Sequence, residues 1–233
     1  MYTARPNKQS GNAMVYVLIV VALFAAITFV LSRQTDSTET DALSDERAEI
    51  LASNIQQSAM SLKQSVEQMI WTGTSIDDLD FSTPDDGAAY DAGSLGDKVF
   101  HPAGGNVILP RIPDAAINQT DTNPPARWYI GRFNNIDWTP TAANDVVLAA
   151  FQLNEAVCRR LNLRLVGDET IPALAGNANR LLITSSETAP DPGNINLTPV
   201  ECADCEGVPA MCVSSTDTNG RTQYTFYSIV AAQ

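Results

Sequence analysis

Near the start of the chain, nineteen consecutive residues, Ala13 to Leu31, carry no charge, no Gly and no Pro. An α-helix of that length is about 28 Å long, close to the hydrocarbon thickness of a bilayer. Because lipid offers no hydrogen-bond partners, a single apolar span must pair its own backbone groups, so it is helical. The pattern therefore predicts a membrane-spanning helix over residues 12–33. The side chains expected to face lipid or neighbouring helices are Met14, Tyr16, Leu18, Ile19, Leu23, Phe24, Ile27 and Phe29.

A second apolar pattern follows a polar patch at residues 34–40. Its apolar residues recur three, four or seven positions apart, and most charged and amide side chains fall between them, which is typical of an amphipathic helix. We predict this helix over residues 34–72, with Gly73 as its C-cap. It either continues the apolar helix or begins separately, with Asp36 and Glu39 as a cap. The predicted stripe consists of Leu43, Ile50, Leu51, Ile55, Ala59, Leu62, Val66, Met69 and Ile70.

The pattern changes after Gly73, and residues 73–233 predict a globular head. A helix is expected over 141–163, with Asn144 or Thr141 as its cap. The remaining signals are β-prone runs, and Asp217-Thr218-Asn219-Gly220 predicts the turn of a C-terminal hairpin. The predicted fold class is α+β, in which a long N-terminal helix packs on a β-rich head with one additional helix. Strands are expected at 99–100, 106–109, 180–185, 210–215 and 222–230. The stretch 128–138 is expected to be either one strand or a hairpin over Asn134-Asn135.

Charge is distributed unevenly about the apolar run. Arg5, Lys8 and Arg33 flank it, and the rest of the chain has 11 of the 14 basic residues against all 27 acidic ones, a charge of about −16. The positive-inside tendency predicts a cytoplasmic N-terminus and export of everything after Arg33. An acidic exported surface argues against nucleic acid as a partner, because phosphates need Lys and Arg.

The residues just before the apolar run carry a family resemblance. Residues 1–11 are short, hydrophilic and basic, they end in Ser10-Gly11, and the apolar helix begins at once with Asn12. This arrangement resembles type IV pilins and pseudopilins, and the resemblance implies that a prepilin peptidase cuts between Gly11 and Asn12. Family members usually carry Glu as the fifth mature residue, where this chain has Tyr16. The tip pseudopilin of type II secretion systems also lacks that Glu, so the resemblance points to a minor subunit.

The resemblance implies a structural role, and the chain is expected not to be an enzyme. The helix would wait in the inner membrane with the head in the periplasm, and an inner-membrane assembly platform would lift it into a filament of like helices. The additional helix resembles the heads of alphaproteobacterial minor pilin-like proteins. A single-span anchored binding or scaffold protein of the envelope, which keeps residues 1–11 and does not polymerise, is the alternative.

Four cysteines, Cys158, Cys202, Cys205 and Cys212, all follow the apolar run. In an exported domain they are expected to be oxidised, and three pairings are open. We favour Cys202–Cys205 within one loop, and Cys158–Cys212 between the predicted helix and the hairpin. The second bridge resembles the disulfide with which pilins commonly clip their C-terminal region.

Other chemistry has weak sequence signals. The acidic stretch 73–97 could bind calcium, but it lacks an EF-hand spacing, and a solvated loop is the preferred interpretation. His101 is the only His, so no His-based triad or His pair is available, and a turn role is expected. We expect no cofactor and no catalytic group.

Overall fold

The computed structural model describes residues 12–183, 195–217 and 219–232, and within the first helix it leaves out the side chains of residues 12–14 and 26–43. This helix, α1, is bounded by Asn12 and Trp71. The chain divides into two compact units, Met1–Glu46 and Arg47–Gln233. The second unit contains the head together with the last part of α1, and the predicted leader 1–11 lies outside the described residues.

The head is built on a four-stranded antiparallel sheet in the order β1-β2-β4-β3. Strand β2 pairs with β1 on one side and with β4 on the other, and all eight of its residues are buried. The α+β class predicted from the sequence is confirmed. The strands are β1 (Trp128–Arg132), β2 (Val146–Leu153), β3 (Ala210–Thr216) and β4 (Thr222–Ala231).

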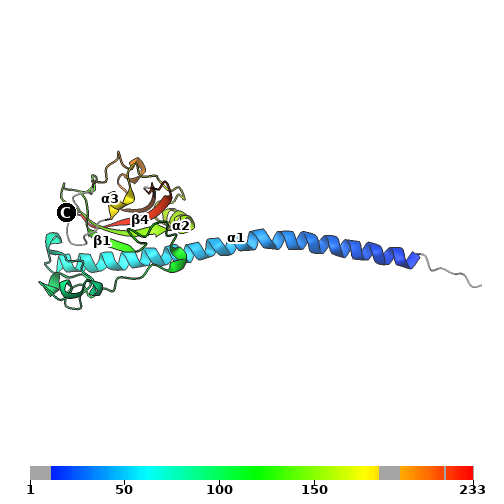
Figure 1. Cartoon of the computed structure of the whole chain (residues 1–233), viewed down its shortest axis with the longest axis horizontal. Helices are drawn as coiled ribbons and strands as arrows, with labels where there is room; N and C mark the ends of the chain where they lie inside the picture. The colour runs from blue at the N-terminus through cyan, green and yellow to red at the C-terminus, as the bar shows by residue number, and fades with distance from the viewer. Residues whose placement is uncertain (1–11, 184–194, 218, 233) are drawn as a thin grey trace, which may run out of the picture. The chain divides into compact units, whose positions relative to one another are not determined.

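Both faces of this sheet are covered. The last part of α1 packs on one face, and α2 (Glu155–Val166) joins the same core at the β3 side. The short helix α3 (Ala178–Leu182) and the chain around Leu197 cover the opposite face. Figure 1 shows α1 and α3 on opposite sides of the strands. Side chains of alternating direction along β2 and β4 therefore enter two separate hydrophobic clusters.

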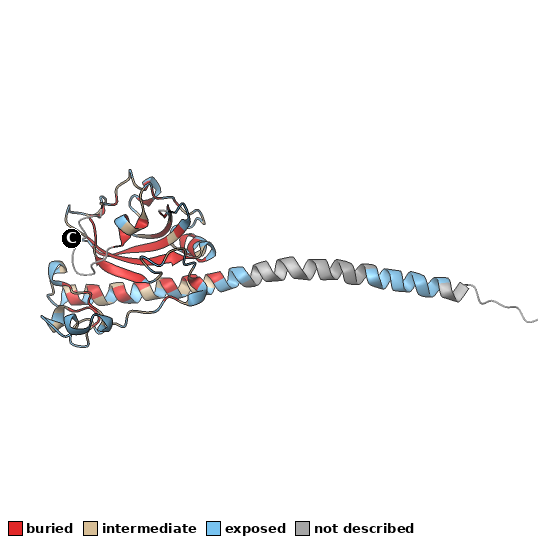
Figure 2. Ribbon diagram, in the orientation of Figure 1, coloured by how far each residue is buried: buried red, intermediate tan, exposed pale blue. Residues whose placement is uncertain are grey.

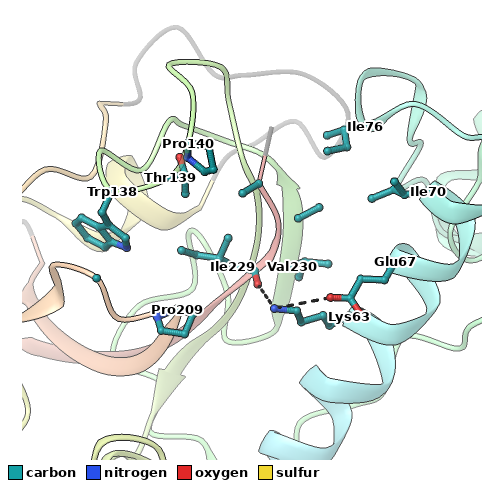
Figure 3. Close-up of a pocket in the computed structure, with 13 residues that line it drawn as sticks. Lys63, Glu67, Ile70, Ile76, Trp138, Thr139, Pro140, Pro209, Ile229 and Val230 are labelled. Carbon is teal, nitrogen blue, oxygen red and sulfur yellow. Dashed lines mark hydrogen bonds and ion pairs between the residues drawn. The ribbon is translucent and has the colours of Figure 1, made fainter.

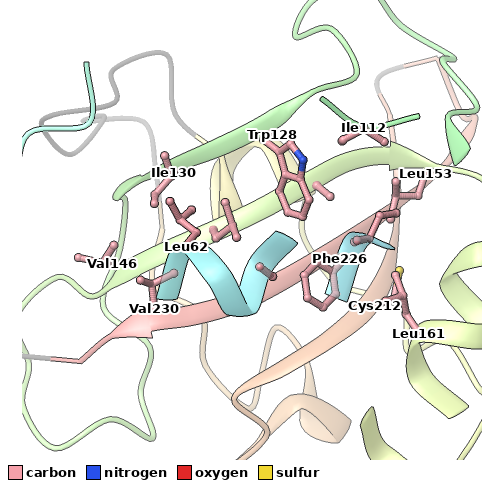
Figure 4. Close-up of a cluster of buried hydrophobic side chains, with 14 of the residues drawn as sticks. Leu62, Ile112, Trp128, Ile130, Val146, Leu153, Leu161, Cys212, Phe226 and Val230 are labelled. Carbon is pink, nitrogen blue, oxygen red and sulfur yellow. The ribbon is translucent and has the colours of Figure 1, made fainter. Parts of the chain in front are cut away.

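The buried residues of α1 form a regular stripe. From Ala48 to Met69 they recur at alternating intervals of four and three, so they lie on one face of the helix. Figure 2 shows this buried stripe along the sheet. Leu62 reaches among Ile130, Val146 and Val230 (Figure 4). The predicted stripe is largely confirmed, but Ile50 is wrong, because it is 62% exposed, and the side chain of Leu43 lies outside the described part.

A glycine ends α1 where the sequence predicted it. Gly73 has φ +115°, its N–H donates to the carbonyl of Ile70, and the next N–H, of Thr74, donates to the carbonyl of Met69. These two bonds satisfy carbonyls that the last turn leaves without partners.

Four secondary-structure predictions were wrong. Of the stretch 128–138, only Trp128–Arg132 forms a strand, and there is no hairpin over Asn134-Asn135. The expected helix 141–163 is β2 followed by α2, because the apolar run 146–153 lies in the middle of the sheet, and Asn154, not Asn144 or Thr141, caps the helix by accepting from the N–H of Val157. The expected strand 180–185 begins as α3, capped by Asn177. Residues 99–100 and 106–109 form no strand. Two α-helices accompany α1 among the described residues, not one.

The outer edge of β3 is occupied by the chain itself. The amide of buried Asn162 on α2 donates to the carbonyl of Cys212 and accepts from its N–H. Beside it, Cys158 is bonded to Cys212, and Cys202 to Cys205, so both favoured pairings are present. Further along, Ser214 donates to the carbonyl of Pro172. These contacts block addition of another strand at this edge.

A buried lysine organises the irregular segment that follows α1. The ammonium of Lys98, whose side chain is 1% exposed, pairs with Asp80, donates 2.9 Å to Ser82 Oγ and donates 2.8 Å to the carbonyl of Ala89. Three turns of one loop thereby converge on one cation, which is satisfied by all three. Burial disfavours ionisation of Asp80, but hydrogen bonds from Lys98 and Ser82 outweigh it and lower the pKa of Asp80.

The two disulfides should differ in their contribution to stability. The Cys158–Cys212 bridge joins residues 54 positions apart, whereas Cys202–Cys205 joins residues three apart. Chain entropy predicts a loss of about 4 kcal/mol when the first is replaced by Ala-Ala and about 2 kcal/mol for the second. Denaturant unfolding of the oxidised full-length chain in detergent measures both, and equal losses would contradict the loop-length argument.

The lowered pKa of Asp80 predicts a loss of stability in acid. Because the folded carboxyl has the lower pKa, its contribution is present above the unfolded value near 4 and is lost as pH falls through the folded value. Asp80→Asn should cost roughly 2 kcal/mol at pH 7 and flatten the pH dependence below pH 4. The matched control is Asp91→Asn, at an exposed position of the same loop. Equal acid sensitivity in both variants would contradict the assignment.

Candidate functional site

The first candidate site is the apolar surface of α1 in the unit Met1–Glu46. Tyr16, Leu18, Ile19, Leu23 and Phe24 have exposed fractions between 50% and 68%, and their apolar neighbours at 15, 17, 20 and 21 are equally exposed. Figure 2 shows this exposed segment. Contiguous apolar surface of this kind marks contact with lipid or protein.

Other predicted members of this site have no described side chains. Asn12 and Met14 belong to α1 but their side chains lie outside the described part, as do those of Ile27 and Phe29, and Gly11 precedes it. Among the residues that could be searched, none of the helices has the length and apolarity needed to traverse a bilayer.

The second candidate site is a cavity of about 500 Å³ in the head, between the last turns of α1 and the end of β4. Ile70 and Ile76 form one wall, and Trp138 and Pro140 lie across from them (Figure 3). The cavity is within the range that holds a ligand or a few residues of a partner. Its charged members are Lys63 and Glu67, whose ammonium and carboxylate are 4.0 Å apart.

A proline explains why a lysine lies in this cavity. The N–H of Ile229 donates to the carbonyl of Pro209, just beyond the first β3–β4 pair. In an antiparallel ladder the facing residue would return a hydrogen bond, but Pro has no N–H. Lys63 Nζ donates 3.2 Å to the carbonyl of Ile229 instead. The lysine thus replaces the missing backbone donor and ties α1 to β4.

A third feature is a groove of about 360 Å³ beside α1, lined by Asn54, Ser58 and Ser61 on the helix and by Val107, Ile108 and Pro110 on the loop. The loop is held against the helix at Gly105, whose carbonyl accepts 2.9 Å from Ser65 Oγ. A Cβ at Gly105 would lie 2.4 Å from the carbonyl oxygen of Val99 and 2.8 Å from Met69 Sδ. Ile108 itself projects outward, with an exposed fraction of 90%.

The arginines of α2 all have partners in the head. Arg159 pairs with Glu155 at 3.2 Å, Arg160 with Glu169 at 2.7 Å, and Arg164 with Glu49 of α1 at 2.5 Å. Arg164 links α2 to α1.

A polar cavity of about 420 Å³ lies beside the start of α2. Tyr224 donates 3.0 Å to Glu155 Oε2, and burial together with this carboxylate raises the pKa of the tyrosine. A phenol with a raised pKa is a poor base and a poor nucleophile at neutral pH. This arrangement gives no support to catalysis.

The residues considered for metal binding have local structural roles. Asp80 pairs with Lys98, and Asp86 accepts from the N–H and hydroxyl of Thr83 at the start of a 3-10 turn. His101 packs against Tyr90, with ring centroids 5.0 Å apart, and accepts from the N–H of Ala103, which is a turn role. Among the described residues, no group of three or more His, Cys, Asp or Glu could hold a metal ion.

Comparisons of this chain with models of protein families, with curated proteins and with solved structures found no match.

Sequence reasoning missed the lysines. Lys63 was assigned to the polar side of an amphipathic helix, and Lys98 was only the start of a β-prone stretch. One signal in the sequence points to Lys63. Pro209 directly precedes the predicted strand 210–215, and because Pro has no N–H, the carbonyl that faces it on the partner strand lacks a backbone donor. Nothing in the sequence around Lys98 indicates that Asp80 and Ser82 converge on it.

Removing the ammonium of Lys63 should weaken the junction between α1 and β4. Lys63→Met keeps the length of the side chain but leaves the Ile229 carbonyl without its donor, and the expected loss is about 1 kcal/mol. Lys63→Arg should retain most of the stability because it keeps a donor. Thermal or denaturant unfolding of the three proteins checks this, and equal losses in both variants would contradict the capping role.

Proposed function

We propose that this protein is a structural subunit, minor or pseudopilin-like, of a type IV pilus-related filament or secretion pseudopilus. The observation that carries the proposal is the contrast along α1. The apolar side chains of the segment 15–24 are exposed, whereas those of the segment 48–69 are buried against a disulfide-bonded sheet. One helix therefore has one end fixed in a head and the other end in need of apolar surroundings.

The free energy of exposing these apolar side chains to water is the basis of the proposed assembly mechanism. Leaving one large apolar side chain in water costs roughly 1.5–3 kcal/mol relative to burial, and nine residues of this segment carry such side chains. Before assembly, lipid of the inner membrane would cover them. In the filament, the helices of other subunits would take the place of lipid. The partners of this proposal are like subunits, a prepilin peptidase and an inner-membrane assembly platform.

The head suits an exported location. Two disulfides and no free cysteine are expected of an oxidising compartment, and the acidic charge keeps an exported domain soluble. We propose a structural role and not a catalytic one, on the basis of the contrast along α1. Tyr16 in place of the family's Glu favours a minor subunit over a self-polymerising one.

A single-span envelope protein that does not polymerise is the second candidate. The cavity beside Lys63 favours it to the extent that a binding module needs a hollow in its head. The two proposals differ in the fate of residues 1–11 and in whether the exposed apolar helix meets copies of itself.

Cleavage of the leader is the first test. In cells with working pilus machinery, the mature protein should begin at Asn12, and Gly11→Leu should keep Met1 or the following residue as the N-terminus. Ser10→Ala is the matched control and should still be cut. N-terminal sequencing or intact mass of the protein from envelope fractions measures the outcome. An uncut wild-type chain in such cells would favour the anchored protein.

The second test asks whether the exposed part of α1 contacts another subunit. Val17→Cys, at a position with a 62% exposed side chain, should crosslink to another subunit under mild oxidation, because filament helices pack side by side. Mass spectrometry under non-reducing conditions should show the Cys158–Cys212 and Cys202–Cys205 disulfides in the exported protein. A cleaved but monomeric chain that never crosslinks at Val17 would overturn the proposal.

A further inference from the structure

We propose that neighbouring heads join through a knob and a hole carried by the same chain: the tip at Ile108 of one copy inserts into the Lys63–Trp138 cavity of the next. This inference rests on the proposed function, because it names the contact between heads of such a filament. The knob is the uncharged tip 107–110 (Val-Ile-Leu-Pro), at which Ile108 is 90% exposed. The hole is the cavity of about 500 Å³ with walls of Ile70, Ile76, Trp138 and Pro140.

The charges around the hole favour a neutral, apolar occupant. Lys63 donates to the Ile229 carbonyl and lies 4.0 Å from Glu67, so the hole carries one charge of each sign and has no net charge to attract an anionic ligand. The remaining walls are mostly apolar (Figure 3). An apolar chain tip fits this lining better than a polar metabolite does.

The rim of each surface carries one exposed ion pair, Arg111–Asp114 beside the knob and Lys63–Glu67 beside the hole. Arg111 directly follows the knob, and its side chain is 90% exposed, with Asp114 at 3.9 Å. Glu67 borders the hole, and its side chain is 45% exposed. Docking of the knob would bring a cation to the side of the carboxylate. This complementarity selects a second copy of the chain over an unrelated apolar partner.

The positions of knob and hole along α1 decide the kind of assembly. The groove beside the knob uses helix positions 54, 57, 58 and 61, and the hole uses 63, 67 and 70. At 100° per residue these two sets lie close to half a turn apart around α1, and their centres are about 14 Å apart along its axis. A contact between different surfaces does not close into a dimer; it repeats as a ring if the rotation closes and as a helical filament if it does not. The offset along α1 favours the filament.

Crosslinking of two differently tagged full-length copies in the envelope tests the contact. Ile108→Cys on one copy and Pro140→Cys on the other should form a mixed disulfide, and neither variant should pair with itself. A chain that carries both substitutions should give a ladder of dimers, trimers and larger species. Val166→Cys, another exposed apolar position, is the matched control and should not crosslink to Pro140→Cys.

Charge reversal supplies the second arm. Arg111→Glu or Glu67→Arg alone should lower the crosslink yield roughly two- to five-fold, as expected for an exposed pair, and a mixture of Ile108→Cys/Arg111→Glu with Pro140→Cys/Glu67→Arg should restore it. Pairing of Ile108→Cys with itself, or equal yields with Val166→Cys, would overturn the inference.

The Val17→Cys crosslink separates the two proposals. If it forms and the Ile108–Pro140 crosslink does not, the knob-and-hole contact is wrong and the filament proposal stands. If neither forms, the filament proposal fails, and the inference fails with it.

Discussion

The structure of the head depends on the packing of one stripe of α1 against the sheet. Ile55, Leu62, Val66 and Met69 are almost fully buried there. At roughly 1.5–3 kcal/mol each, these four side chains together contribute on the order of 6–12 kcal/mol, as much as the net stability of an ordinary domain. The sheet face beneath them, with Trp128, would otherwise be exposed. The head is therefore expected to unfold without this part of the helix, because its core would lose one side.

Polar contacts fix the course of the segments whose position the apolar stripe of α1 does not determine. The segment from Gly73 to β1 contains only short 3-10 turns, so it has few backbone ladders to define its course. Lys98 gathers three of its turns, and Gly105 fixes it to α1 through Ser65. At the other flank Lys63 supplies the donor that Pro209 lacks. These contacts position the knob and the hole on opposite flanks of α1 without adding a further element to the fold.

What the sequence could predict follows from the range of the interactions involved. The stripe of α1, its end at Gly73, the hairpin 210–231 and both cystines follow from local periodicity, turn residues and cysteine placement. The run 146–153 was predicted wrongly because a fully buried strand is apolar at every position, and short apolar runs look alike in helices and central strands. Whether this run is a helix or a strand is decided by its pairing with β1 and β4, which is a nonlocal interaction.

Gln152 shows why such nonlocal information was out of reach. It is the last residue but one of β2 and has φ +59°, a conformation rare for a residue other than Gly. Its buried amide accepts from the N–H groups of Thr120 and Asp121 and donates to the carbonyl of Pro124, which gives the preceding loop its course. The strained backbone is stabilised by contacts some thirty residues away, so no window around Gln152 contains the reason for it. The cavities are set by the same kind of contact, and they too were invisible in the sequence.

The apolar side chains at the two ends of α1 differ in their surroundings. The apolar stripe of the segment 48–69 is already buried in the core of its own chain. The segment 15–24 has no apolar surroundings within its own unit and must obtain them from other molecules. Because lipid and like helices would satisfy it almost equally well, the apolar effect alone would give little direction to the proposed transfer from membrane to filament. Directional contacts are therefore needed elsewhere on the subunit, and the head is the part of the chain that can supply contacts that are present in the filament and absent in the membrane.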